Sequence, residues 1–203
     1  MPANKDSGFN RDLNWQIEFF CNIIRKNQIL EQVLRKARGL PLNAYYIGAG
    51  CLSQTVWNYL SGFPLNQGIK DIDLVYFDQD LSYQKEDRII KLVNQLLADI
   101  PLKIDVKNQA RVHLWYKEHF GYDIMPYSQL EEAVNSWPTT ATAIATRLDQ
   151  DNNWVIYAPF GLNDLLGKIV RANKTQITKE IYHKKVERWR AIWPDLKIIP
   201  WEK

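Results

Sequence analysis

The stretch Ile69-Lys-Asp-Ile-Asp-Leu-Val-Tyr-Phe77 decides the fold, because it is the clearest strand in the chain and carries two acidic residues. Successive side chains of a strand point to opposite faces of its sheet. Asp71 and Asp73 therefore share one face, whereas the apolar residues that alternate with them turn toward a core. The stretch predicts a buried strand with two carboxylates on its open side.

A second strand supplies a third acidic residue. The run Leu102-Lys-Ile-Asp-Val-Lys107 alternates strictly between apolar and polar residues, so Asp105 lies on the side away from the core. If this strand neighbours the first, three carboxylates converge and their charges raise one another's pKa values. A divalent cation removes that penalty, and ligands that are all oxygen favour Mg²⁺ or Mn²⁺. The sequence therefore predicts a metal site formed by Asp71, Asp73 and Asp105.

A purely structural role for these acidic residues competes with metal binding. In that alternative, Asp71 begins a strand, Asp73 is solvated, and Asp105 pairs with Lys103 or Lys107. An Asp-x-Asp motif alone is a weak signal. The metal site is favoured because a glycine turn and a helix precede the strand, and because the third acidic residue has the required facing.

The glycine turn Gly48-Ala-Gly50 joins a predicted buried strand, residues 44–48, to a helix that begins at Ser53. Helix N termini expose free N–H groups, and glycines let a phosphate approach the backbone. The turn thus predicts a phosphate-binding site, with a plain connection capped by Ser53 as the alternative. The chain lacks the lysine of a P-loop and the full GxGxxG pattern, which argues against a P-loop enzyme and a classical dinucleotide-binding domain.

Residues directly after the strand of Asp105 are candidates for contact with a nucleotide. Asn108 or Gln109 can hydrogen-bond a base or a sugar, and Arg111 can pair with a phosphate. An equally favoured alternative pairs Arg111 with an acidic residue at the start of a helix.

Five blocks follow one another along the chain and carry a resemblance. They are Tyr46-Ile-Gly-Ala-Gly-Cys-Leu-Ser-Gln-Thr-Val-Trp-Asn58, Asp71-Ile-Asp-Leu-Val-Tyr-Phe-Asp78, Val106-Lys-Asn-Gln-Ala-Arg-Val-His-Leu-Trp-Tyr116, Pro138-Thr-Thr-Ala-Thr142 and Tyr157-Ala-Pro-Phe-Gly-Leu-Asn-Asp164. Together they resemble the bacterial nucleotidyltransferase-like family of the DNA polymerase beta-like superfamily. The resemblance spans residues 45–193 and implies an α/β (α+β) fold, a mixed sheet flanked by helices.

The resemblance also implies an activity, in which a nucleoside monophosphate group moves from a nucleoside triphosphate to an acceptor with two bound metal ions. The glycine turn, together with Ser53, would hold the β- and γ-phosphates. Asp71 and Asp73 would bind both metal ions. Asp105 would hold the catalytic metal and help to deprotonate the acceptor. The chain departs from the superfamily pattern in its Gly-Ala-Gly turn and in the longer loop before Asp71.

The periodicity along the chain predicts one domain. It comprises a mobile tail over 1–10, an N-terminal helix within 12–40, a catalytic α/β core over 44–160 and C-terminal helices over 161–203. Helices are predicted at 12–37, 53–60, 83–97, 111–120, 128–136, 162–171 and 178–193, and strands at 44–48, 69–77, 102–107, 141–148 and 154–157.

The composition limits the partners and the location. A formal net charge of +3 over 203 residues neither requires nor excludes a polyanionic partner. The basic excess between residues 168 and 190 is predicted to be a solvated face, and nucleic-acid contact there is less favoured. The first ten residues are polar and no apolar run approaches the ~20 residues of a membrane span. A cytoplasmic protein without a membrane partner is therefore expected.

Three activities fit these features. A nucleotidyltransferase is favoured, because the set of carboxylates is complete. A nucleotide-binding sensor with the same fold and no turnover is the first alternative, and a metal-dependent phosphohydrolase is the second. The acceptor of a transferase can belong to a small metabolite, a protein or an RNA.

Overall fold

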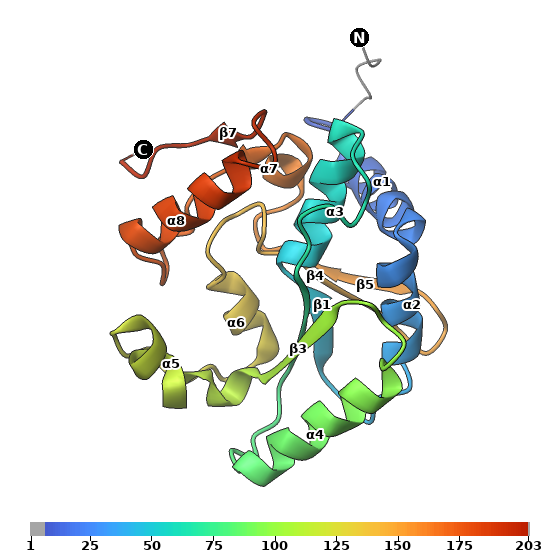
Figure 1. Cartoon of the computed structure of the whole chain (residues 1–203), viewed down its shortest axis with the longest axis vertical. Coiled ribbons are helices and arrows are strands. Elements are labelled where there is room, and N and C mark those ends of the chain that lie inside the picture. Colours follow the sequence, from blue (N-terminus) through green and yellow to red (C-terminus); the bar gives the residue numbers. More distant parts are fainter. Residues whose placement is uncertain (1–6, 203) are drawn as a thin grey trace.

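The computed structural model describes residues 7–202 and is built on one five-stranded mixed sheet (Figure 1). The strand order is β3-β2-β1-β4-β5; β2 and β3 run parallel, and the other neighbours run antiparallel. The strands are β1 (Tyr45–Gly48), β2 (Asp71–Tyr76), β3 (Lys103–Asn108), β4 (Ala145–Leu148) and β5 (Trp154–Tyr157). The two acidic strands of the sequence prediction are therefore neighbours.

Helices surround this sheet. They are α1 (Leu13–Lys26), α2 (Gln28–Ala37), α3 (Gly50–Ser61), α4 (Tyr83–Leu96), α5 (Val112–Phe120), α6 (Leu130–Asn135), α7 (Asn163–Leu166) and α8 (Lys179–Arg190), with a 3₁₀ turn, η1, at Gln109–Arg111. Among residues 7–202 no helix has both the length and the apolar character needed to cross a bilayer.

The two faces of the sheet differ. One face is mostly apolar: Ile72, Leu74 and Tyr76 of β2 are completely buried, and α2, α3 and α4 pack against β4, β2 and β3. The other face carries the acidic residues, and a smaller apolar cluster that includes Val75 and Val134 of α6 covers only part of it. Alternation along β2 therefore separates a core side from an open acidic side.

The predicted helix over 12–37 is wrong in one respect, because the chain breaks at Asn27 into α1 and α2. Asn27 is 1% exposed. Its side-chain oxygen accepts a bond from the Leu30 amide, and its side-chain amide donates to Thr55 Oγ1 at 2.9 Å. Asparagine at an N-cap position starts a new helix. The N-terminal helix of the prediction is thus a helix pair tied to α3.

Two further elements differ from the prediction. The strand predicted over 141–148 begins only at Ala145, because the preceding residues form a turn in which the Ala143 amide donates to the Thr139 carbonyl. The helix predicted over 162–171 ends at Leu166, and Lys168 has a positive φ of 53°. The chain then forms β6 (Ile169–Val170), which pairs with β7 (Lys197–Ile198).

The predicted tail over residues 1–10 lies partly outside the described residues. Its described part, residues 7–10, packs on the body of the protein. The Asn10 amide donates to Asn163 Oδ1 at 2.8 Å, and the Gly8 carbonyl accepts a bond from the Gln16 side chain at 2.9 Å.

A tryptophan cluster fastens α8 to α3. Trp57 of α3 lies edge-on to both Trp189 and Trp193, with ring centroids 5.5 Å apart in each pair. Trp193 Nε1 also donates to Asn58 Oδ1 at 2.8 Å. Because Trp57 and Trp193 are completely buried, this contact sets the position of α8 over the acidic end of β2.

Candidate active site on the acidic face of the sheet

The strand register brings the predicted carboxylates together. Asp73 of β2 is paired with Asp105 of β3 on one side and with Gly48 of β1 on the other. Asp71 lies two residues earlier on β2 and so on the same face. The glycine turn and three acidic residues therefore meet at one end of three adjacent strands.

The surroundings of Asp73 perturb its carboxyl group. Burial, together with the carboxylates of Asp71 and Asp105, raises the pKa of Asp73 to about 6, and Lys107 and Lys185 oppose the shift. A carboxylate with a raised pKa in a cleft marks a candidate functional group. The main physical cause is burial, which disfavours the charged form, and the neighbouring carboxylates add a smaller contribution in the same direction.

Lys107 takes part in this balance through an ion pair with Asp105 on the same strand. The structural alternative for Asp105, pairing with a neighbouring lysine, is the arrangement that the structure adopts. Among residues 7–202, no three His, Cys, Asp or Glu side chains lie closely enough to hold a metal ion as they stand. The donor types and the register fit a hard divalent cation, and the ion pair with Lys107 competes with it for the Asp105 carboxylate.

The glycine turn is closely packed, and its residues have structural roles that the sequence does not indicate. A Cβ on Gly48 would lie 2.3 Å from the ring of Trp137, so only glycine lets that ring pack on the strand. The next residue, Ala49, has a φ of 57°. Ser53 is completely buried, and its hydroxyl donates to the carbonyls of Ala49 and Gly50, each at 3.3 Å. The structure therefore places neither Gly48 nor the Ser53 hydroxyl where a phosphate can reach them.

Gly48→Ala is expected to destabilise the protein by about 1–3 kcal/mol, because the new methyl group forces the Trp137 ring or the strand to move. Urea unfolding of the purified variant measures the loss. Gly39→Ala is the matched control, since a Cβ there meets only one backbone oxygen, at 3.4 Å. Equal stability of the two variants would show that Trp137 does not require a glycine at position 48.

Asn108 and Arg111, the predicted nucleotide contacts, are engaged elsewhere. The Asn108 side chain is 1% exposed and bonds both the amide and the carbonyl of Asp78, at 3.0 and 2.8 Å. Arg111 lies 3.1 Å from Glu86 of α4 in an ion pair whose side chains are 12% and 14% exposed. Both residues thus fasten α4 and the loop after β2, and the acidic partner of Arg111 is the alternative that the structure adopts.

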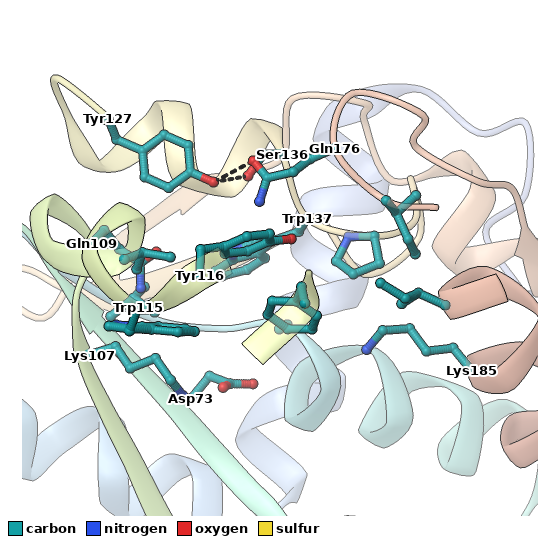
Figure 2. Close-up of a pocket in the computed structure, with 17 residues that line it drawn as sticks. Asp73, Lys107, Gln109, Trp115, Tyr116, Tyr127, Ser136, Trp137, Gln176 and Lys185 are labelled. Carbon is teal, nitrogen blue, oxygen red and sulfur yellow. Dashed lines mark hydrogen bonds between the residues drawn. The ribbon is translucent and has the colours of Figure 1, made fainter. Parts of the chain in front are cut away.

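A cavity of about 260 Å³ opens beside Asp73 (Figure 2). Three aromatic side chains dominate the view of its walls: Trp115 and Tyr116 of α5, and Trp137 after α6. Asp73 and Lys107 lie at one end. Flat aromatic walls next to a carboxylate site suit a ligand with a flat ring and an anionic group.

Gln109 is a polar group in the wall of this cavity. It is 5% exposed and lines the cavity, and its side-chain amide has no hydrogen-bond partner among residues 7–202. The amide is accessible from the cavity, so it can donate a hydrogen bond to a ligand there or accept one. The sequence predicts such a contact for Asn108 or Gln109, and Gln109 is the one of the two that lines the cavity.

A hydrogen-bonded group forms the opposite edge of the cavity. The Tyr127 hydroxyl lies 2.6 Å from Ser136 Oγ and donates to Gln176 Oε1 at 2.8 Å (Figure 2). These bonds hold three loop or helix-end residues in fixed positions. The cavity therefore has a rigid polar edge facing the acidic strands.

Helix α8 contributes a lysine that the sequence interpretation assigned to a solvated basic face. Half-buried Lys185 lines the cavity and is directed toward it in Figure 2. It has no ion-pair partner within the described part of the chain. Burial lowers its pKa, as does Arg188, while Asp73 and Asp71 act against the shift. The sequence contains one indication that Lys185 is not solvated. It lies three residues after Tyr182 and four before Trp189, on the side of the helix that faces the core.

Comparison with known proteins agrees with this geometry. A family model described as nucleotidyltransferase matches residues 35–198. A protein whose NMR structure reveals a CCA-adding enzyme head domain superposes with a TM-score of 0.73 and 24% identity, over 90% of this chain and 95% of that one. Two apo forms of a tRNA-processing enzyme superpose with TM-scores of 0.50 and 0.51, each at 17% identity.

The two tRNA-processing structures are matched over 82% and 86% of this chain and over only 44% of their own. No curated protein matched the sequence. The likeness to the head domain shows a polymerase beta-like nucleotidyltransferase fold, as the five sequence blocks predict. Because the family model covers most of its length, the chain belongs to this nucleotidyltransferase family.

Proposed function

We propose that the protein transfers a nucleoside monophosphate group from a nucleoside triphosphate to an acceptor, with Asp71, Asp73 and Asp105 as the ligands of Mg²⁺ or Mn²⁺. The observation that carries the proposal is the register, which pairs Asp73 with Asp105 and keeps Asp71 on the same face. Divalent ions held there would stabilise the entering and the leaving oxygens of the displacement.

The residues of the chain then have distinct roles. The acceptor oxygen forms a bond to the α-phosphorus, the bond from that phosphorus to the bridging oxygen breaks, and pyrophosphate leaves. Asp105 accepts the acceptor proton once its carboxylate has left Lys107. Lys107 and Lys185 flank the reacting phosphate and supply positive charge, which stabilises the charge that develops in transfer.

The aromatic cavity suits the nucleoside part of the donor. Its volume of about 260 Å³ is a little below the ~300–1,000 Å³ of typical ligand pockets, so it suits part of a nucleotide better than the whole. Stacking of a base on an aromatic side chain contributes ~1–3 kcal/mol. The unpaired amide of Gln109 gives the base or sugar a hydrogen-bonding partner.

Gln109→Met is expected to weaken binding of the preferred nucleoside triphosphate about tenfold and to reduce discrimination among the four bases, since one directional hydrogen bond is lost. Competition binding with the four triphosphates measures both effects. Gln95→Met, on the exposed side of α4, is the control for the same change away from the cavity. Unchanged affinities in Gln109→Met would remove Gln109 from the nucleotide site.

A transfer assay tests the function itself. The protein is incubated with Mg²⁺ or Mn²⁺ and α-labelled triphosphates, beside Asp73→Asn, in the presence of a metabolite extract, a protein pool or an RNA pool. The RNA pool is included because two of the similar structures are of a tRNA-processing enzyme. Label on an acceptor in the wild type alone supports transfer.

The other outcomes separate the competing activities. Turnover of the triphosphate without an adduct indicates a phosphohydrolase, and binding without turnover indicates a sensor. A wild-type protein that neither binds nor consumes any triphosphate would overturn the proposed function.

A further inference from the structure

Two lysines flank Asp105 on the open face of β3, which is the outermost strand at one edge of the sheet. Lys103 and Lys107 are each two residues from Asp105, so alternation along the strand puts all three side chains on the same face. The structure uses the two lysines differently. Lys107 forms an ion pair with Asp105, and the two side chains are 34% and 28% exposed. Lys103 is exposed and has no ion-pair partner among residues 7–202.

Lys107 also faces Asp73. The register pairs Asp73 with Asp105 and Val75 with Lys107, so Lys107 lies diagonally across from Asp73 on the neighbouring strand. Figure 2 shows the Lys107 side chain ending beside Asp73, at one end of the aromatic cavity. Of the two lysines that oppose the rise in the pKa of Asp73, Lys107 has the larger effect. One ammonium group therefore lies against two of the three proposed metal ligands.

This ammonium group and a divalent cation compete for the same carboxylate. Mg²⁺ and Mn²⁺ bind carboxylate oxygens directly, and Lys107 donates a hydrogen bond to an oxygen of Asp105. The positive charge of Lys107 also repels a second cation at close range. Lysine carries its charge on a flexible stem of four carbons, so Lys107 can leave Asp105 without a change in the strand. The ion pair thus lowers the affinity of the site for metal in a way that movement of one side chain reverses.

A bound triphosphate offers Lys107 a better partner. Lys107 lines the aromatic cavity, the proposed site of the nucleoside, and half-buried Lys185 of α8 lines it as well. The phosphates that follow the nucleoside bring several negative charges, whereas Asp105 brings one. Hydrogen bonds from an ammonium group to phosphate oxygens are charge-assisted and therefore strong. A lysine that turns to the phosphates leaves the Asp105 carboxylate free.

We infer that Lys107 is a positioning residue that couples metal binding to nucleotide binding. Paired with Asp105, it withholds one of the three carboxylates from a divalent cation. Paired with the phosphates of a bound triphosphate, it releases that carboxylate. The inference rests on the proposed function and adds an order of events to it, because the full set of carboxylates becomes available only after the donor has bound.

Two titrations of Lys107→Met test this role. The first adds Mn²⁺ without nucleotide and follows the electron paramagnetic resonance signal of free Mn²⁺. The second adds a nucleoside triphosphate in EDTA, without metal. Lys103→Met is the matched control, because Lys103 has the same charge and the same spacing from Asp105 but no ion pair. Lys107→Arg keeps the charge at position 107.

The two titrations are expected to move in opposite directions. Lys107→Met binds Mn²⁺ at least about fivefold more tightly than the wild type, because Asp105 is free, and binds the triphosphate about fivefold more weakly, because a phosphate partner is lost. Lys103→Met stays within about twofold of the wild type in both titrations. Lys107→Arg brings both affinities back toward the wild type. Damage to the fold would instead weaken both ligands, and thermal unfolding of each variant checks for it.

An Asp105→Asn background shows whether the gain in Mn²⁺ affinity depends on the ion pair. With the amide in place, no carboxylate remains for Lys107 to release. The gain from Lys107→Met is then expected to fall to about twofold, the part due to its charge near Asp73. A gain of undiminished size in this background would show that Lys107 acts by its charge alone.

Each contrary outcome identifies what fails. No Mn²⁺ gain in Lys107→Met, or an equal gain in Lys103→Met, overturns the role of the ion pair. A triphosphate affinity that Lys107→Met leaves unchanged, or a wild type that binds none in EDTA, overturns the release by phosphates. The proposed transfer survives either result if the wild type moves label in the transfer assay. A protein that binds neither Mn²⁺ nor triphosphate in any variant overturns the proposed function as well.

Discussion

Asp73→Asn is expected to abolish nucleotidyl transfer, with a loss of at least about a thousandfold in rate, because metal-bound carboxylates supply several kcal/mol of transition-state stabilisation. The amide is nearly the same size as the carboxylate, so the aromatic cavity keeps its shape. Single-turnover assays with labelled triphosphate measure the loss. Transfer at the wild-type rate in this variant would exclude Asp73 from the metal site.

The same substitution is expected to stabilise the metal-free protein at pH 8. Burial and the neighbouring carboxylates raise the pKa of Asp73 from 3.8 to about 6. Folding therefore favours the protonated group and disfavours the ionised one. At pH 8 the folded state bears the full cost, up to about 3 kcal/mol at 1.36 kcal/mol per pKa unit. The cost shrinks as the pH falls through 6 and disappears below the unfolded value.

Urea unfolding in EDTA at pH 8 and pH 4.5 measures this difference between the wild type and Asp73→Asn. Asp151→Asn, in the exposed turn between β4 and β5, controls for the loss of one negative charge. A variant that is less stable than the wild type at pH 8 would show that Lys107 and Lys185 fully satisfy the Asp73 charge.

Trp57→Ala is expected to cost about 3–5 kcal/mol of folding free energy, because it removes a completely buried ring and leaves a cavity. Such a loss is a large part of the ~5–15 kcal/mol that stabilises a typical domain. The void lies against Trp189 and Trp193, so α8 loses its main support on α3. Triphosphate affinity should fall as well, since α8 carries Lys185.

Trp57→Phe is the matched control. It keeps an aromatic ring against α8 and removes an indole N–H that is buried without a hydrogen-bond partner within residues 7–202. Its expected cost is within about 1–2 kcal/mol, because removing an unsatisfied buried donor offsets part of the lost packing. Urea unfolding of both variants gives the comparison. Similar small losses in the two would show that the tryptophan cluster does not hold α8 in place.

The local sequence pattern predicted the acidic face of the sheet, because alternation along one strand decides which face each side chain occupies. Alternation within residues 69–77 and 102–107 was enough to put three carboxylates on the side opposite the core. The five sequence blocks added the superfamily and hence the order of the central elements. Helix ends were harder to place, since Asn27, which caps the second helix, is held in the core by a bond to Thr55 that no local pattern contains.

The side chains that surround the carboxylates could not be predicted from the sequence, because contacts between distant residues decide which of them line the site. Asn108 and Gln109 are adjacent and chemically alike, yet one fastens the loop at Asp78 and the other lines the cavity. Likewise, α4 supplies Glu86 to Arg111 and so withdraws that arginine from the site. Sequence spacing does not distinguish such neighbours, because the partner that decides between them lies on another element.

The sequence by itself thus determined that Asp71 and Asp73 share a face and that Asp105 faces the same way, since strand alternation depends only on neighbouring residues. Tertiary structure decided what lies opposite them. Trp193 bonds Asn58 across 135 positions of the chain, and that packing brings α8 over β2. The result is a carboxylate site beside an aromatic cavity that Lys185 of α8 also lines, an arrangement that depends on long-range packing and so has no local signature.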